Sequence, residues 1–323
     1  MTDNRAGLCL AMDIGGTNIR LGLVRENGQI MARRHLPCRI GQGFEPFLDS
    51  IRDEIKVLRR MAEGLNEPLL VLGGGIPGLI DSHGLVLSSV NLPALETLNM
   101  RRCLEEISGL PVAVQNDANG AALAEWRYGA GRPYSSLLHF TLGTGVGSGL
   151  ILDGHLWTGV DGVAAEYGHA TVEPEGHPCP CGSRGCLEQY ASATAIARMA
   201  RERIEGGEAT SLKKDAGSFP DSAEVSAAAG NGDPLALACF ATAGRYLGIA
   251  AASAVNLLNL EAIVIGGGAG QSYALLADHV KDEINQRAFR VPAQRVRLLQ
   301  GELGDDAGLL GAAAAGWKLL TAP

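Results

Sequence analysis

The sequence predicts an α/β protein made of two similar lobes, and three observations support this prediction. The chain has 323 residues, which is long for a single hydrophobic core. Its composition of 46% apolar residues with 44 glycines suits close-packed helices and sharply turning backbone. An apolar strand, a glycine-rich turn and a second strand occur at residues 8–24 and recur at residues 137–152. A recurrence of this kind indicates a duplicated lobe.

The first lobe is expected to open with an antiparallel meander, because Asn27-Gly28 is a hairpin signal between two apolar runs. A helix is expected at 44–63, with its apolar residues on one stripe, and a second helix at 118–128 begins at the boundary to the second lobe. The expected strands are residues 8–14, 19–24, 30–36, 69–72 and 112–115. The last strand runs directly into the second helix, and α/β proteins bind their ligands at such junctions.

The second lobe is expected to repeat this plan. Asp233-Pro234 is typical of a helix start. The expected strands are residues 137–142, 150–152 and 261–265, and the expected helices are about 190–205, 223–229, 233–258 and 306–320. We place the first lobe at residues 1–117 and the second at 118–304, with the terminal helix of about 305–323 packing back on the first lobe.

Charge and composition exclude several classes of function. Acidic residues outnumber basic ones by 35 to 27, for a net charge of −8, and no Lys/Arg cluster is present, so a nucleic acid partner is not expected. Residues 1–12 resemble no secretory signal, and no later stretch approaches the ~20 apolar residues of a membrane span. We therefore expect a soluble, cytoplasmic protein. Its 7 Cys are then not a disulfide framework.

Two glycine turns have the chemistry of phosphate binding. In residues 13–18 and 142–147, glycine lets backbone amides approach a phosphate and a threonine hydroxyl can add a hydrogen bond. Neither is a Walker loop, because no lysine follows the glycines. Each turn alone could equally be a tight hairpin. The two together, with Gly266-Gly267-Gly268 after a third strand, favour a nucleotide.

Asp13 ends the first strand and is expected to face the phosphates. A carboxylate there can hold Mg²⁺ through its water shell. The alternative is a carboxylate that only caps the turn.

A small insertion at residues 166–188 carries a metal-ligand pattern. Cys179, Cys181 and Cys186 lie within eight residues, and His169 lies ten residues before the first of them. Three sulfurs and one nitrogen form a set that tetrahedral Zn²⁺ accepts, and four protein ligands would make the site structural. His177 is a rival ligand, and buried or redox-sensing thiols without metal are the alternative. We prefer His169 because the longer loop can wrap the ion.

Three carboxylates are candidates for substrate chemistry. Asp117 follows an apolar strand and opens a helix, so it is either an N-cap or a catalytic group. Glu166 and Glu188 flank the expected metal ligands, and a metal would fix both in space. Such carboxylates suit a polyol, because each can accept two hydroxyl hydrogen bonds. The alternative is a pair of surface acids.

These motifs together resemble the ROK family of sugar kinases and sugar-responsive repressors, over essentially the whole chain. The matching segments are 13–18 and 142–147 (phosphate motifs), 75–78 (sugar loop), 116–117 (catalytic Asn-Asp), 166–169 (Glu-x-Gly-His), 179–188 (Cys-x-Cys-Gly-x-x-Gly-Cys-x-Glu) and 266–268 (adenosine-side glycines).

The resemblance implies a two-lobed, actin-like ATPase fold with ribonuclease H-like lobes, and a kinase that transfers the γ-phosphate of ATP with Mg²⁺ to a sugar hydroxyl. Asp117 would accept the hydroxyl proton, and His169 would ligate a structural zinc with one nitrogen while the other faces the sugar. The implied sugar-side residues are Gly78, Asn91, Asn116, Asp117, Glu166, His169 and Glu188. The implied nucleotide-side residues are Asp13, Gly15, Gly16, Thr17, Asn18, Gly143, Thr144, Gly145, Gly267 and Gly268.

The family also contains non-catalytic sugar-sensing regulators. We expect a kinase, because the Asn-Asp pair is intact and the first phosphate motif begins at residue 13, which leaves no room for a preceding DNA-binding module. Glucose is the first expected substrate, followed by N-acetylglucosamine or N-acetylmannosamine and then fructose. Family members are commonly homodimers, and the alanine-rich helix at 233–258 is a candidate interface.

Overall fold

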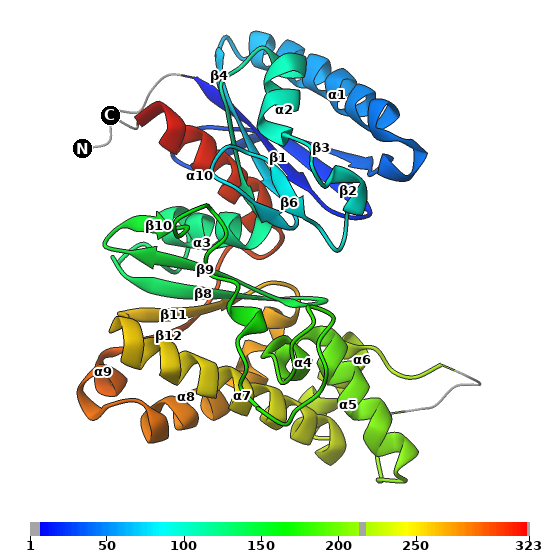
Figure 1. The fold of residues 1–323 in the computed structure, drawn as a ribbon, viewed down its shortest axis with the longest axis vertical. Coiled ribbons are helices and arrows are strands. Elements are labelled where there is room, and N and C mark those ends of the chain that lie inside the picture. Colours follow the sequence, from blue (N-terminus) through cyan, green and yellow to red (C-terminus); the bar gives the residue numbers. More distant parts are fainter. Residues whose placement is uncertain (1–6, 213–217, 322–323) are drawn as a thin grey trace. The chain divides into compact units, whose positions relative to one another are not determined.

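The protein is described by a computed structural model, which covers residues 7–212 and 218–321. Its internal contacts divide the chain into two units (Figure 1). The first unit comprises Met1–Arg132, Leu156–Ala165 and Asp305–Pro323. The second comprises Pro133–His155 and Glu166–Gly304. The helix at 118–128, which we had assigned to the second lobe, thus falls in the first unit.

The first unit is built on a five-stranded mixed sheet with the order β3-β2-β1-β4-β7. Its first three strands form an antiparallel meander, and β4 and β7 are added in parallel. The strands are β1 (Leu8–Ile14), β2 (Asn18–Val24), β3 (Ile30–Pro37), β4 (Leu69–Ile76) and β7 (Val112–Asn116). A separate two-stranded sheet pairs β5 (Leu79–Ile80) with β6 (Val86–Ser88).

Four helices accompany the first sheet: α1 (Phe44–Gly64), α2 (Met100–Ser108), α3 (Asp117–Tyr128) and α10 (Ala307–Thr321). The terminal helix α10, red in Figure 1, packs against β1, β4 and α3. Glycine permits this approach at two positions. A Cβ on Gly73 would overlap the carbonyl oxygen of Ala312, and a Cβ on Gly311 would overlap that of Gly120. Backbone therefore packs directly on backbone along α10.

The second unit repeats the topology of the first. Its five-stranded sheet has the order β10-β9-β8-β11-β12, with β8 and β9 antiparallel and β11 and β12 added in parallel. The strands are β8 (Leu137–Leu142), β9 (Val146–Leu152), β10 (His155–Trp157), β11 (Ala262–Gly266) and β12 (Arg297–Gln300). Strand β10 belongs to this sheet, although the division by contacts assigns its last two residues, Leu156 and Trp157, to the first unit. The recurrence expected from the sequence is thus present in the strand order.

The helices of the second unit are α4 (Glu188–Ala191), α5 (Ala193–Glu205), α6 (Ser222–Gly230), α7 (Pro234–Leu258), α8 (Tyr273–Arg287) and α9 (Arg290–Arg295). Asp233 caps α7 by accepting a hydrogen bond from the Ala236 amide, and Pro234 occupies the first turn. The sequence analysis did not predict α2, which ends at its Gly109 cap, or the elements α8, α9 and β12.

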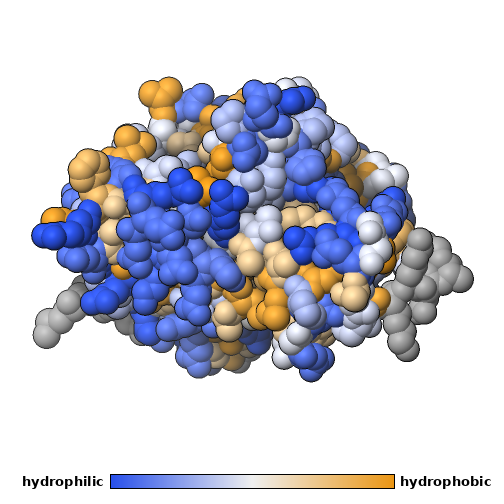
Figure 2. All heavy atoms as spheres, turned by 90° about the horizontal axis from the view of Figure 1, so that it is seen from below, coloured by the Kyte–Doolittle hydropathy of each residue, from blue (hydrophilic) through white to orange (hydrophobic). Residues whose placement is uncertain are grey.

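The sequence analysis expected no apolar stretch of membrane-spanning length, and helix α7 corrects this expectation. By length and composition alone, α7 is long and apolar enough to cross a membrane. However, 67% of its most apolar window is buried inside the protein, where α7 packs mainly against α8. Figure 2 shows one face of the molecule, on which hydrophilic residues adjoin smaller hydrophobic groups. The apolarity of α7 is therefore explained by its place in the core of the second unit.

The packing of α10 predicts the effect of one substitution. Gly73→Ala should lower the free energy of unfolding by about 1–3 kcal/mol or prevent folding, because the added methyl group has no space beside the Ala312 carbonyl. Gly41→Ala is the matched control, since a Cβ there meets nothing within 4 Å. Thermal and urea denaturation would measure both variants. Equal stability of Gly73→Ala and the wild type would contradict this packing.

Candidate active site

The first glycine turn, residues 13–18, connects β1 to β2 at the surface of the first unit. The Gly15 amide donates to the Asn18 carbonyl at 2.9 Å and closes the turn. Gly16, Thr17 and Asn18 are exposed, and a Cβ on Gly16 would lie 3.8 Å from the Asn91 carbonyl oxygen. The turn thus lies beside the segment that carries Asn91, another expected site residue.

Asp13 lies partly buried at the start of this turn. Its carboxylate is against the first turn of α10, because a Cβ on Gly308 would overlap it. Burial raises the pKa of Asp13, and the Arg20 guanidinium acts in the opposite direction. A cation near the carboxylate would favour its charged form, and the positive end of α10 acts in the same sense.

The expected sugar loop is held in place by a buried serine. Gly78 has φ +118°, and a Cβ there would overlap a backbone carbonyl, so glycine is required. The Ser89 hydroxyl donates to the Pro77 carbonyl at 2.7 Å and accepts from the Leu92 amide at 3.2 Å. Ser89 therefore ties the loop to the segment of Asn91, whose side chain is exposed.

Asn116 and Asp117 both accept hydrogen bonds from backbone amides at the start of α3, and the Asp117 Oδ1 accepts from the Ala118 amide at 2.9 Å. Asn116 is the N-cap of α3, because its Oδ1 accepts from the Ala118 and Asn119 amides at 2.9 and 3.0 Å. Its Nδ2 donates to the Gly78 carbonyl at 3.0 Å. Asp117, the first residue of α3, is exposed at the carboxyl end of β7. Asn116 thus joins the start of α3 to the expected sugar loop.

In the second unit, the second glycine turn is bonded to Glu188. The Val146 amide donates to Glu188 Oε2 at 3.1 Å, and a Cβ on Gly145 would overlap the same oxygen. A Cβ on Gly143 would meet nothing within 4 Å. Glu188 was expected on the sugar side alone, but its carboxylate also anchors this turn.

The Glu-x-Gly-His segment lies directly on β9. A Cβ on Gly168 would overlap the Val146 carbonyl oxygen, so only glycine allows this contact. The Tyr167 amide donates to the Ser148 hydroxyl at 3.1 Å. These contacts hold Tyr167 and Gly168, the two residues between Glu166 and His169, against β9.

Glu166 responds electrostatically to its two expected partners. Partial burial raises its pKa, the nearby His169 lowers it, and the Glu188 carboxylate raises it. Glu166 is therefore close enough to His169 and to Glu188 for its pKa to depend on both.

The ligand atoms of His169, Cys179, Cys181 and Cys186 lie within 4.8 Å of one another. The Cys181 and Cys186 sulfurs are 3.7 Å apart, and His169 Nδ1 is 3.7 Å from Cys179 Sγ. Tetrahedral zinc, with Zn–S near 2.3 Å and Zn–N near 2.0–2.1 Å, requires separations of about 3.8 and 3.6 Å. Burial and the two neighbouring sulfurs raise the pKa of Cys186 to about 12 and so disfavour its thiolate form. A bound cation would favour the thiolate form instead. The residues fit a tetrahedral metal ion.

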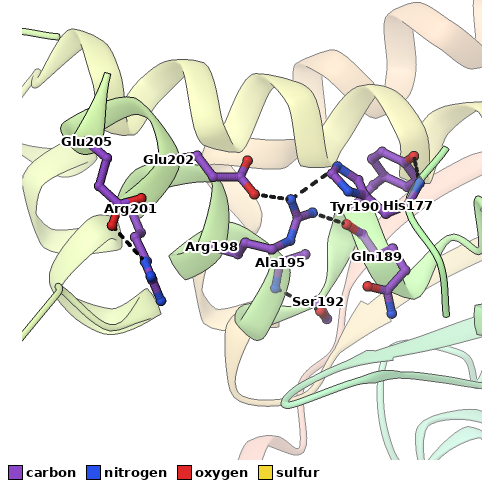
Figure 3. A network of polar contacts seen from close by, with 9 residues as sticks. All are labelled: His177, Gln189, Tyr190, Ser192, Ala195, Arg198, Arg201, Glu202 and Glu205. Atoms are coloured by element: carbon purple, nitrogen blue, oxygen red, sulfur yellow. Dashed lines mark hydrogen bonds and ion pairs between the residues drawn. The ribbon is translucent and has the colours of Figure 1, made fainter. Parts of the chain in front are cut away.

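The rival ligand His177 lies outside this cluster. Its Nε2 accepts from Arg198 Nη1 at 3.1 Å, and its ring lies against Tyr190 (Figure 3). His177 is thus hydrogen-bonded to Arg198 of α5, and this favours His169 as the nitrogen ligand.

The late glycines lie at the base of the second glycine turn. Gly267 has φ +83°, and a Cβ there would lie 2.5 Å from the Leu142 carbonyl oxygen, whereas a Cβ on Gly268 would meet nothing within 4 Å. Gly266 faces the buried His139, whose Nε2 has no hydrogen-bond partner within the described part of the chain. Burial lowers the pKa of His139 to about 4, so it is neutral at neutral pH. Packing therefore accounts for Gly266 and Gly267, and Gly268 is left open to a ligand.

The expected site residues are divided between the two units. In the first unit these are Asp13, Gly15, Gly16, Thr17, Asn18, Gly78, Asn91, Asn116 and Asp117. In the second they are Gly143, Thr144, Gly145, Glu166, His169, Glu188, Gly267 and Gly268. Sequence reasoning missed two hydroxyl donors: Ser89, which donates to the Pro77 carbonyl, and Thr194, which donates to the Thr144 carbonyl at 2.8 Å. A lone Ser or Thr gives no periodic signal, so no sequence pattern marked them.

Fold and site together define an α/β protein with duplicated sheets, paired glycine turns and an exposed carboxylate at a strand end. The model of the ROK family matches residues 9–317, and the chain belongs to this family.

The proteins similar to this chain include glucokinases and a transcriptional regulator. A glucokinase of Thermotoga maritima is 35% identical over 94% of this chain and 96% of its own length. The structure of a Streptomyces griseus glucokinase in complex with glucose and AMPPNP is 32% identical, with a TM-score of 0.80 over 97% of this chain and 100% of that one. A ROK family transcriptional regulator, a homologue of the Escherichia coli MLC protein, is 29% identical with a TM-score of 0.87 over 98% of this chain and 79% of that one.

The hydrogen bonds of Asn116 predict a stability difference between two variants. Asn116→Ala should lower the free energy of unfolding by about 1 kcal/mol, because α3 loses its N-cap. Asn116→Asp should lower the free energy of unfolding by less, because a carboxylate can accept the same two amide hydrogen bonds. Urea denaturation would compare the two variants, and equal losses would show that the cap does not stabilise α3.

Proposed function

We propose that this protein is an ATP-dependent sugar kinase that converts glucose to glucose 6-phosphate. The observation that carries the proposal is Asp117, an exposed carboxylate whose position is set by the Asn116 cap and the sugar loop. Support comes from the glucokinase that is 35% identical and from the similar structure that holds glucose and AMPPNP. ATP and glucose are the proposed small-molecule partners.

We assign sugar-binding groups within each unit separately. Asn91 and the amides of the sugar loop are available in the first unit. Glu166, Glu188 and His169 are the proposed hydroxyl partners in the second unit. Since Glu188 Oε2 already accepts from the Val146 amide, Oε1 is the atom we assign to the sugar.

The proposed nucleotide groups are the two glycine turns together with Gly267 and Gly268. Mg²⁺, when bound with ATP, would neutralise charge on the phosphates, and Asp13 is the residue we assign to its water shell. The raised pKa of Asp13 is consistent with this assignment, since a cation would hold the buried carboxylate in its charged form.

The reaction needs positioning more than covalent chemistry. Asp117 orients the sugar hydroxyl and accepts its proton as the oxygen–phosphorus bond forms to the γ-phosphorus. The bond from that phosphorus to the bridging oxygen breaks, and ADP leaves with the electron pair. Backbone amides of the glycine turns stabilise the charge on the phosphate oxygens. Exclusion of water would prevent futile hydrolysis of ATP.

We propose zinc as the ion held by the Cys/His cluster. Four protein ligands leave no open coordination position, so the ion would orient residues and would not act on substrate. Bound at Nδ1, it would leave His169 Nε2 for a sugar hydroxyl.

A regulator without catalysis is the alternative from another class, favoured by the TM-score of 0.87 to the ROK transcriptional regulator. The sequence pair Asn116-Asp117 supports the kinase. We further propose that the two units are the two lobes of an actin-like ATPase fold, and that the protein is a cytoplasmic homodimer.

A coupled assay of ADP release tests the proposal across glucose, N-acetylglucosamine, N-acetylmannosamine and fructose. We expect the highest kcat/KM with glucose. A higher value with an N-acetylhexosamine would change the substrate, and sugar binding without ADP release on any sugar would favour the regulator.

The role of Asp117 predicts a loss of turnover without a loss of binding. Asp117→Asn should lower kcat by about 10²–10⁴-fold, because the general base is removed, while AMPPNP and glucose still bind. Asp53→Asn, on the exposed face of α1, is the matched control. A kcat near that of the wild type would remove Asp117 from the mechanism.

The cluster predicts a metal content of about one zinc per chain, measured by elemental analysis. Cys186→Ser and His169→Ala should lose most of the metal, whereas His177→Ala and Cys103→Ser should retain it. Protein purified without zinc, or metal loss in His177→Ala alone, would contradict the assigned ligands.

A further inference from the structure

The second glycine turn is held by the start of α5 as well as by Glu188. The Ala193 amide donates to the Gly143 carbonyl at 2.9 Å. The Thr194 hydroxyl donates to the Thr144 carbonyl at 2.8 Å. Two consecutive carbonyls of the turn therefore point at the same helix end.

These two bonds determine where the next two amides point. A carbonyl and the following N–H share one planar trans peptide and point in opposite directions. With the Gly143 and Thr144 carbonyls turned towards α5, the N–H groups of Thr144 and Gly145 point away from it. Two adjacent amides directed to one side form a concave anion-binding arrangement. The Val146 amide is excluded from it, because it donates to Glu188.

The same segment is also attached to the Cys/His cluster. Gln189 Nε2 lies 3.7 Å from Cys179 Sγ, within hydrogen-bonding distance of a sulfur. Arg198 Nη2 donates to the Gln189 carbonyl at 2.7 Å, and Arg198 also contacts His177 and Glu202 (Figure 3). Helix α4 therefore contacts the glycine turn through Glu188 and the cluster through Gln189, and the Ala193 and Thr194 bonds to the turn follow directly after it.

We propose that Thr194 is a positioning residue for the nucleotide, and that α4 with the first turn of α5 transmits the geometry of the Cys/His cluster to the amides of Thr144 and Gly145. The inference rests on the proposed function in one respect, since it takes the second glycine turn as a phosphate site. It adds that metal occupancy controls nucleotide affinity as well as the orientation of the sugar ligands.

The first arm of the test measures the binding of AMPPNP with Mg²⁺ by calorimetry without sugar, and the KM values for ATP and glucose. Thr194→Val removes the hydroxyl and keeps the shape of the side chain. We expect the Kd for AMPPNP and the KM for ATP to rise about three- to tenfold, the value of one hydrogen bond, while the KM for glucose stays within about twofold. Thr194→Ser should restore both values.

Thr242→Val is the matched control, because the Thr242 hydroxyl donates to the Ala238 carbonyl within α7 at 2.9 Å. Unchanged nucleotide affinity in Thr194→Val, with an active wild-type enzyme, overturns the inference and leaves the proposed function intact. A wild-type protein that binds no AMPPNP overturns both.

The second arm tests the connection to the cluster in folded protein, checked by circular dichroism. Removal of metal by a chelator should weaken AMPPNP binding in the wild type and have less effect in Thr194→Val, where the connection is already broken. Gln189→Leu should release metal at a lower chelator concentration and weaken AMPPNP binding. Metal removal that changes glucose affinity alone would overturn the connection.

Discussion

Direct contact between backbones, which only glycine permits, is the constraint on which both units depend. In the first unit Gly73 and Gly311 let α10 lie on β4 and α3. In the second unit Gly168 and Gly267 bring the Glu-x-Gly-His segment and the end of β11 against the second glycine turn. A side chain at any of these positions would separate the elements that position the site. Glycines in the motifs thus serve two purposes, because others, such as Gly143, have open space in front of them.

Helix starts place the charged groups of the first unit. Asp13 lies against the first turn of α10, and Asp117 begins α3. The positive end of a helix stabilises a nearby anion by about 0.3–1 kcal/mol at an exposed site. Asp117 is exposed at its helix start, where it is accessible as the proposed proton acceptor. At Asp13 burial works against ionisation, so that carboxylate has more to gain from a cation. Asp13 and Asp117 thus both lie at helix starts and differ in their burial.

Periodic and local signals made much of the fold predictable from the sequence. The stripe of α1, the Asp233-Pro234 start of α7 and the recurring strand–turn–strand pattern each needed only neighbouring residues. Helix α8 was missed because its polar and charged residues obscure the few buried ones, Leu276, Val280 and Ile284. At the site, the glycine turns and the Cys/His set were visible as spacings. The sequence did not show the N-cap role of Asn116 or the hydrogen bond between Glu188 and the Val146 amide. Both depend on which backbone groups come close together in three dimensions.

Helix α4 shows why such distant contacts are needed. It contains only four residues, and a helix of one turn has no stability of its own in water, because nucleation is unfavourable. The position of Glu188 must therefore come from attachments at both ends. Cys186 and the Gln189 contact to Cys179 hold one end, and the Ala193 and Thr194 bonds hold the other. If the cluster were loosened, Glu188 would keep its covalent neighbours but lose its orientation, and the Val146 amide would lose its acceptor. The proposed metal would therefore act on the candidate site only by holding Glu188 in this orientation.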